Sequence, residues 1–134
     1  MPHKKVIIVG CGRLGSTLAN DLSADGHHVT VIDTSESSFT KLSSAFSGFK
    51  VVGDATELQT LKDANVREVD YLFAATTEDN TNLMVAQVAK EIFDIPLVIA
   101  RVYDPQQEVV YADFGIETVS PTRLSASAFH QLVS

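Results

Sequence analysis

Residues 6–15 read VIIVGCGRLG, an apolar run that passes directly into a glycine-rich turn. The run at 6–9 predicts a buried strand, and Leu14, Leu18 and Leu22 repeat at the spacing of an amphipathic helix. A G-x-G-x-x-G that closes a strand and opens a helix is typical of a loop that binds a pyrophosphate or polyphosphate at the helix N-terminus. The chain is therefore predicted to begin with a phosphate-binding α/β unit.

The three glycines of this turn have separate physical roles. Gly10 permits the tight turn, Gly12 removes the Cβ that would keep a phosphate away from the backbone, and Gly15 lets the helix approach the strand. The predicted cofactor-binding loop comprises Gly10, Cys11, Gly12, Arg13, Leu14 and Gly15.

Short β-branched runs alternate with helical patterns along the rest of the chain. Most of these runs are continuously apolar, as expected of strands that are covered on both faces. We predict an α/β fold in which a six-stranded, mostly parallel sheet carries helices on both faces. The predicted strands are Lys5–Val9, His28–Ile32, Lys50–Val52, Tyr71–Ala75, Leu97–Val102 and Glu117–Ser120.

Apolar spacing and capping residues predict further helices. Phe39, Leu42 and Phe46 repeat at i, i+3 and i+7, which predicts an amphipathic helix over that segment. Asp104 with Pro105, and Ser120 with Pro121, each combine an N-cap with a proline at the first helical position. The last helix is predicted from about residue 121 to the chain end. Its apolar residues either pack back on the sheet or form a surface for a partner: Leu124, Ala128, Phe129, Leu132 and Val133.

Composition excludes several classes of protein. The 134 residues suit one domain, predicted over residues 1–134, and a net charge of −7 disfavours nucleic acid as a partner. The longest apolar runs are too short to span a membrane and no signal peptide is evident, so a soluble, cytosolic protein is expected. A single cysteine, Cys11, leaves no internal disulfide and no cysteine-based zinc site.

Asp33 closes the second predicted strand, 18 residues after Gly15, where the fingerprint places an acid that accepts hydrogen bonds from ribose hydroxyls. A carboxylate there repels a 2′-phosphate, and residues 34–36 supply no cation. The sequence therefore favours NAD or an adenosine nucleotide over NADP. A helix cap is the alternative role for Asp33.

Two further segments follow predicted strands at the same sheet edge, where open α/β sheets bind ligands. Asp54, Ala55 and Thr56 come after the third strand, and Asp54 is predicted either to bond an adenine edge or to cap the next helix. Small side chains end the fourth strand and leave room for phosphates or a second ribose: Ala74, Ala75, Thr76 and Thr77.

Catalytic groups expected of a nicotinamide-dependent oxidoreductase are not evident in the sequence. None of the three tyrosines is followed four residues later by lysine, and the four histidines form no recognisable catalytic set. The chain also has no G-x-x-x-x-G-K-[ST] phosphoryl-transfer loop. Binding without turnover is therefore predicted, and an NAD-dependent oxidoreductase fragment is the alternative.

Six motifs in order over nearly the whole chain together resemble one family, the RCK N-terminal domain, also called TrkA-N, of potassium channel and transporter regulators. These motifs are VGCGRLG at 9–15, VID at 31–33, GDAT at 53–56, AATTEDNTNL at 74–83, ARV at 100–102 and FGIETVSP at 114–121.

The resemblance implies a Rossmann-like, doubly wound fold that binds ATP, ADP, AMP or NAD(H) as a regulatory signal. It implies a homodimer or a larger ring that is cytoplasmic, is not inserted in the membrane, and controls a potassium transporter or channel subunit. It also assigns the phosphates to the glycine loop, the ribose to Asp33, and the adenine to Asp54, Ala55 and Thr56.

Two arginines match basic positions of the family. The resemblance places Arg13 at a phosphate of the neighbouring protomer and Arg101 near the crevice. The alternatives are a solvated helix start for Arg13 and a structural salt bridge for Arg101. Some relatives bind a divalent cation through a glutamate that this chain replaces with Thr122, so no metal site is predicted.

The resemblance also concerns two helices. It implies that the terminal helix crosses to a partner subunit, and the Leu83–Val88 face either serves the same interface or is buried on the sheet. Family regulators carry a smaller C-terminal domain after the terminal helix, so the chain is predicted to be a stand-alone domain or a fragment.

Overall fold

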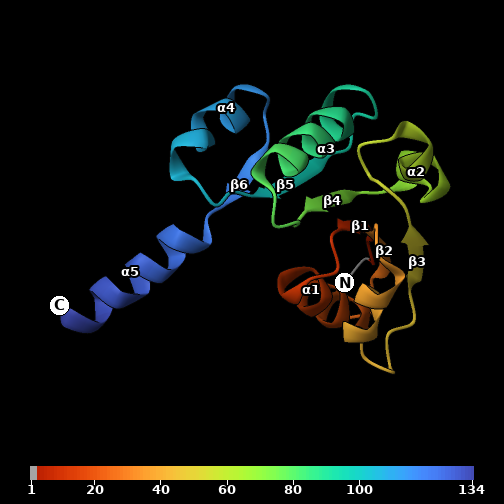
Figure 1. Cartoon of the computed structure of the whole chain (residues 1–134), viewed down its shortest axis with the longest axis horizontal. Coiled ribbons are helices and arrows are strands. Elements are labelled where there is room, and N and C mark those ends of the chain that lie inside the picture. The colour runs from red at the N-terminus through yellow and green to blue at the C-terminus, as the bar shows by residue number, and fades with distance from the viewer. Residues whose placement is uncertain (1–2) are drawn as a thin grey trace.

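The computed structural model describes residues 3–134 and contains one six-stranded sheet in the order β3-β2-β1-β4-β5-β6 (Figure 1). Every neighbouring pair is parallel, so the predicted α/β class is confirmed and the sheet is wholly parallel. All six predicted strands are present with bounds that differ by at most one residue at either end. The strands are β1 (Lys5–Val9), β2 (His28–Asp33), β3 (Phe49–Val52), β4 (Tyr71–Ala74), β5 (Leu97–Arg101) and β6 (Glu117–Val119).

The strand order reverses beside β1, which lies between β2 and β4. Val9, at the end of β1, pairs with Ile32 on one side and Ala74 on the other. The loops after β1, β2 and β4 therefore leave the same edge of the sheet at neighbouring positions. This is the switch point at which open α/β sheets form a ligand crevice.

Helices cover both faces of the sheet (Figure 1). One face packs on α2 (Leu58–Asp63), α3 (Asp79–Glu91) and α4 (Glu108–Asp113), with the short 3-10 turns η2 (Val66–Glu68) and η3 (Pro105–Gln107) beside them. The other face packs on α1 (Arg13–Ala24) and the 3-10 helix η1 (Glu36–Lys41). Side chains of β1 alternate between the two cores, with Ile7 and Val9 in one and Val6 and Ile8 in the other.

The predicted helix over Phe39–Phe46 is wrong beyond its first residues. The segment is a 3-10 helix that ends at Lys41, and an irregular loop follows it. Serine side chains bond the loop backbone: Ser43 Oγ accepts the Ala45 N–H, and Ser23 Oγ accepts the Ser47 N–H. These bonds compete with helical ones. The apolar side chains still pack on the core from the loop.

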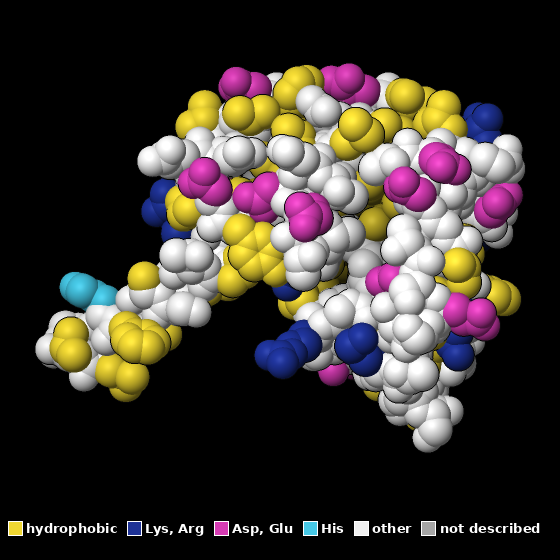
Figure 2. Space-filling model, viewed as in Figure 1, with side chains coloured by type: hydrophobic (Ala, Val, Ile, Leu, Met, Phe, Trp, Pro, Cys, Tyr) yellow, Lys and Arg dark blue, Asp and Glu magenta, His cyan; other side chains and the backbone are white. Residues whose placement is uncertain are grey.

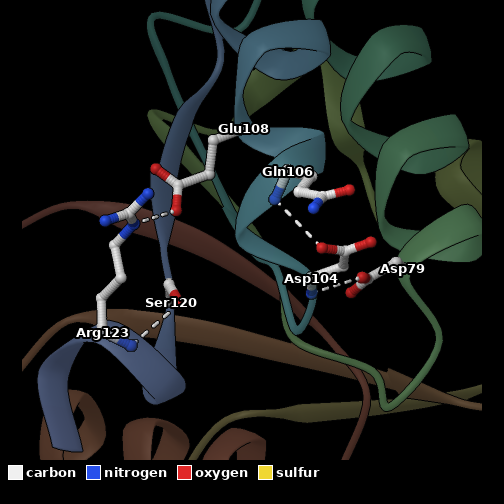
Figure 3. Close-up of polar contacts among 6 residues, drawn as sticks. All are labelled: Asp79, Asp104, Gln106, Glu108, Ser120 and Arg123. Carbon is white, nitrogen blue, oxygen red and sulfur yellow. Dashed lines mark hydrogen bonds and ion pairs between the residues drawn. The ribbon is translucent and has the colours of Figure 1, made fainter. Parts of the chain in front are cut away.

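Both predicted cap-and-proline starts are confirmed. The Asp104 side chain accepts the Gln106 N–H at the start of η3, and Ser120 Oγ accepts the Arg123 N–H at the start of α5 (Pro121–Val133) (Figure 3). An ion pair of 2.8 Å between Arg123 Nε and Glu108 Oε1 holds the first turn of α5 beside α4.

Beyond its first turn, α5 extends away from the body as an arm (Figures 1 and 2). It contains no buried residue, and Phe129 and Leu132 are 75% and 87% exposed. Of the two predicted roles for its apolar residues, packing back on the sheet is therefore wrong. The Leu83–Val88 face of α3, by contrast, lies mostly against the sheet, and only Met84 is exposed within it.

Within residues 3–134, no helix combines the length and apolar character needed to cross a bilayer. Over the same range, no three side chains of His, Cys, Asp or Glu cluster closely enough to hold a metal ion.

Candidate functional site

A cleft of about 580 Å³ opens at the carboxyl edge of the sheet, above the switch point between β1 and β4. It brings together nine of the thirteen predicted site residues, from five separate segments at the ends of β1 to β5. These nine are Gly10, Gly12, Arg13, Asp33, Asp54, Ala55, Ala75, Thr76 and Arg101. The other four, Cys11, Leu14, Gly15 and Thr56, do not line it.

The glycine loop has the shape that the sequence predicted for a phosphate site. Gly10 has a φ of +101°, and a Cβ on Gly15 would overlap the Gly10 carbonyl oxygen. A Cβ on Gly12 would meet nothing within 4 Å, because Gly12 faces the open cleft. The backbone at Gly12 is thus directly accessible to a ligand, and α1 lies tightly against β1.

The N-terminus of α1 is electrostatically suited to an anion. Gly12 is the N-cap, no side chain caps the first turn, and the turn contains no acidic residue. The first N–H groups of a helix have no partner inside it and carry the positive end of its dipole. Arg13 adds a full positive charge at the mouth of the cleft and takes part in neither ion pair of the described residues.

Asp33 is held in place by two backbone groups. Its Oδ2 accepts the Cys11 N–H at 2.8 Å, and its Oδ1 accepts the Ser35 N–H at 2.9 Å. The N-cap of η1 is Ser35, so Asp33 is not the cap of that helix. The carboxylate is half-buried, lines the cleft and has lone pairs left for hydroxyl donors.

Cys11 contributes its backbone to the site and its side chain to the core. The thiol is fully buried among the residues that pack α1 on the sheet. Burial raises the pKa of Cys11, the Asp33 carboxylate raises it further, and Lys41 and Lys50 oppose this rise. Gly15 lies in the contact between α1 and β1, and neither Leu14 nor Gly15 lines the cleft.

Asp54 lies in a turn that is closed by Thr56. Its Oδ1 accepts both the Thr56 hydroxyl, at 2.6 Å, and the Thr56 N–H, at 2.9 Å. These two bonds lower the pKa of Asp54, the hydroxyl bond most. Since α2 begins at Leu58 with Glu57 as its N-cap, Asp54 does not cap α2. Thr56 therefore orients Asp54, which itself lines the cleft.

Arg101, at the end of β5, lies on backbone carbonyls and an aromatic ring. Its guanidinium donates to the carbonyls of Ala75 and Thr76 at 3.1 Å and lies 4.8 Å from the Tyr103 ring centroid. It has no carboxylate partner in the described part of the chain, so the predicted salt bridge is not present. The charge of Arg101 is available to an anion in the cleft.

Asn82, buried on α3, holds these loops together. Its side chain bonds the Thr76 N–H, hydroxyl and carbonyl, and also donates to the Arg101 carbonyl at 2.9 Å. Asp79, one turn earlier, accepts the N–H groups of Tyr103 and Asp104 (Figure 3 shows the second bond). Both residues lie in the motif at 74–83, but no role was predicted for either, because each role depends on a contact with the end of β5 or the segment after it.

Other residues that line the cleft were not among the predicted site residues, namely Thr34, Ser38, Lys41, Gly53, Thr77, Thr81 and Tyr103 as well as strand residues. The most consequential is Lys41, which lies eight residues after Asp33. The cleft is lined by three cationic side chains, Arg13, Lys41 and Arg101, and by two carboxylates, Asp33 and Asp54. In a chain with a net charge of −7, this local excess of positive charge favours an anionic ligand.

A wholly parallel, doubly wound sheet with a glycine loop at its switch point, and an acid at the end of the second strand, defines the Rossmann-like class. Within that class, the model of the TrkA-N domain matches residues 6–121. The chain therefore belongs to the TrkA-N family, and the resemblance seen in its sequence motifs is confirmed.

One curated relative is the Trk system potassium uptake protein TrkA of Streptomyces coelicolor, which is 42% identical over 121 residues. That alignment covers 90% of this chain and 54% of the relative, so the chain spans a little over half of the relative's length.

Solved structures that share the fold include two TrkA-N or Kef domains. The TrkA-N domain of the inner membrane protein ybaL from Escherichia coli superposes with a TM-score of 0.88 at 21% identity, covering 99% of this chain and 98% of that one. The Shewanella denitrificans Kef CTD in AMP bound form gives a TM-score of 0.80 at 25% identity, covering 97% and 82%.

Proposed function

We propose that this chain is a nucleotide-binding regulatory domain that controls a potassium transporter or channel. The observation that carries the proposal is the pairing of two features in one cleft: the uncapped N-terminus of α1 at Gly12 and the anchored carboxylate of Asp33. Phosphate and ribose are the groups that these features recognise.

The cleft residues suit an adenine nucleotide or NAD(H) in a definite order. The α1 N-terminus and Arg13 bind the phosphates, and Asp33 accepts hydrogen bonds from the ribose hydroxyls. Asp54 and Ala55 border the adenine, while Ala75, Thr76 and Arg101 border the phosphates or a second ribose. The TrkA-N relationship and the AMP-bound Kef CTD support this class of ligand.

The partner that we propose is a membrane potassium transporter or channel subunit, met from the cytoplasmic side. The support is the Trk system potassium uptake protein, to which the chain is 42% identical. We also propose that the chain assembles as a homodimer or a larger ring through α5, whose apolar side chains are exposed. A single nucleotide-binding domain over residues 1–134, ending in this helix, stays a prediction.

Regulation would follow from differential affinity. A nucleotide that binds one arrangement of subunits more tightly than another shifts the population toward the first. Arg13 is exposed at the mouth of the cleft, where a phosphate held by a neighbouring protomer can reach it. A ligand that carries this phosphate would hold protomers together, and one that lacks it would release them. No reaction is required, so we propose that the domain is not an enzyme.

Calorimetric titration with ATP, ADP, AMP, NAD and NADH tests this function. The expected result is saturable binding of at least one of them, with no product detected by chromatography after prolonged incubation. Hydride transfer or nucleotide hydrolysis would favour the enzyme class. The absence of binding by all five nucleotides would contradict the proposal.

A further inference from the structure

The short helix η1 (Glu36–Lys41) forms one wall of the cleft immediately after Asp33. A 3-10 helix has three residues per turn, so residues three apart lie on the same side. Ser38 and Lys41 are three apart, and both line the cleft together with Thr34. The Ser38 hydroxyl and the Lys41 ammonium group thus share the side of η1 that faces the cleft, and Thr34 precedes the helix.

Lys50, a residue of β3, lies beside a different side of this helix. It lies in a separate shallow hollow with Glu36 and Thr40 and does not line the cleft. Both lysines are exposed, but only Lys41 is placed where a ligand held by Asp33 would meet it. Lys41 makes neither ion pair found within residues 3–134, so its charge is not already neutralised by a carboxylate of this part of the chain.

We propose that Lys41 and Ser38, assisted by Thr34, bind a phosphate on the 2′ position of the adenosine ribose. The cleft would then accept the 2′-phosphorylated dinucleotide NADP(H) as well as NAD(H). The proposal rests on the proposed nucleotide function, because it extends the ribose end of the same cleft. In dinucleotide folds, a basic side chain close to the end of the second strand is the feature that accommodates a 2′-phosphate.

Asp33 opposes a second phosphate, and its surroundings reduce that opposition. Each of its oxygens accepts a backbone N–H, from Cys11 and from Ser35, which partly compensates the carboxylate charge. The Ser35 bond also turns the chain into η1, so the same contact that anchors the acid directs Ser38 and Lys41 to its side of the cleft. The Asp33 carboxylate and the Lys41 ammonium group therefore both face a ligand at the ribose end of the cleft.

A long lysine side chain suits ligands that carry either a hydroxyl or a phosphate at the 2′ position of the ribose. The Lys41 stem is flexible and its head is in solvent, so it can reach a 2′-phosphate or remain hydrated when the ribose carries hydroxyls. We therefore expect NADH and NADPH to bind with similar affinity, not strict selection of either.

The test is calorimetric titration of the chain with NADH, NADPH, 5′-AMP and 2′,5′-ADP at fixed ionic strength. Lys41→Ala is compared with Lys50→Ala, which removes the same charge from β3, outside the cleft. We expect NADPH to bind wild type within about threefold of NADH. Lys41→Ala should weaken NADPH and 2′,5′-ADP about tenfold while NADH and 5′-AMP change less than threefold, and Lys50→Ala should change none of them more than about twofold.

Two outcomes would overturn the proposal while leaving nucleotide binding intact. One is that NADH binds and NADPH does not. The other is that Lys41→Ala and Lys50→Ala weaken NADPH equally, which would indicate a general charge effect. If no nucleotide binds at all, the proposed function fails and this inference fails with it.

Discussion

The backbone N–H of Cys11 donates to Oδ2 of Asp33 over 2.8 Å, which joins the glycine loop after β1 to the end of β2. The group that meets the ribose and the loop that meets the phosphates are thus one hydrogen-bonded unit. Because a charged acceptor strengthens such a bond, Asp33 supports the loop as well as contacting the ligand.

The glycine loop predicts different outcomes for two alanine substitutions. Gly15→Ala places a Cβ against the Gly10 carbonyl oxygen, and we expect a loss of about 3 kcal/mol in unfolding free energy. Gly12→Ala meets open space, so the fold should be retained while nucleotide affinity falls at least about tenfold. Urea denaturation and calorimetry measure the two effects. A stable Gly15→Ala, or full nucleotide affinity in Gly12→Ala, would contradict this view of the loop.

Arg13 is predicted to distinguish ligands by their phosphates. Charge reversal in Arg13→Glu should weaken ATP more than NAD, because in the proposed assembly the arginine reaches a terminal phosphate that is held by the neighbouring protomer. Titration of wild type and Arg13→Glu with both ligands measures the difference. Equal losses for ATP and NAD would count against a contact between protomers.

Tyr111 predicts a decline of stability at alkaline pH. Its side chain is fully buried and its hydroxyl donates to the Asp79 carbonyl at 2.8 Å. Burial, and then the Asp79 charge, raises the pKa of Tyr111 to about 12 from its ordinary value of 10.0. As the pH rises, the unfolded chain loses this proton before the folded chain does. The contribution of Tyr111 to the free energy of unfolding is therefore complete below pH 10 and declines from there to about pH 12.

Removal of the Tyr111 hydroxyl tests whether its ionisation is linked to the stability of the fold. Tyr111→Phe should lower stability by about 1–2 kcal/mol at pH 8, because the Asp79 carbonyl loses its partner. The gap between wild type and variant should narrow as pH rises from 10 to 12. Urea titrations at several pH values measure it, and a gap that is independent of pH would show that Tyr111 does not titrate as described.

The arm formed by α5 predicts an assembly that depends on its apolar face. Leu132→Asp should convert a wild-type dimer to a monomer, because an unpaired carboxylate would be buried in the interface. Ser127→Asp carries the same charge on the opposite side of the helix and should leave the dimer intact. Light scattering measures the mass. A Leu132→Asp variant that dimerises like wild type would exclude this surface.

The sheet could be predicted because its strands are short apolar runs whose limits depend on local residues. The glycine loop could be predicted for the same reason, since the strand, the three glycines and the helix follow one another directly in the sequence. The helix predicted over residues 39–46 is wrong because Leu42 and Phe46 have helical spacing but pack from a loop that serine side chains stabilise. A pattern of apolar residues predicts which side chains are buried more reliably than it predicts the backbone conformation of the segment that carries them.

Only part of the cleft could be predicted, because some of its residues follow fixed spacings in the sequence and others do not. Asp33 and the glycine loop obey fixed spacings, whereas Lys41 enters the cleft only because η1 is a 3-10 helix that starts just after Asp33. The contacts of Asn82 with Thr76 and Arg101 join segments up to 19 residues apart. No local pattern indicates such contacts.

The most direct test of nucleotide binding at this cleft is a calorimetric comparison of Asp33→Asn with Asp21→Asn, titrated with ADP. Asp21 is an exposed acid on α1 outside the cleft, so both variants lose one negative charge. The amide keeps one oxygen for the loop but loses the charged acceptor for the ribose. We predict that Asp33→Asn lowers ADP affinity at least about tenfold while Asp21→Asn binds like wild type. Equal affinity in the two variants would contradict the assignment of the ribose to Asp33 and of the nucleotide to this cleft.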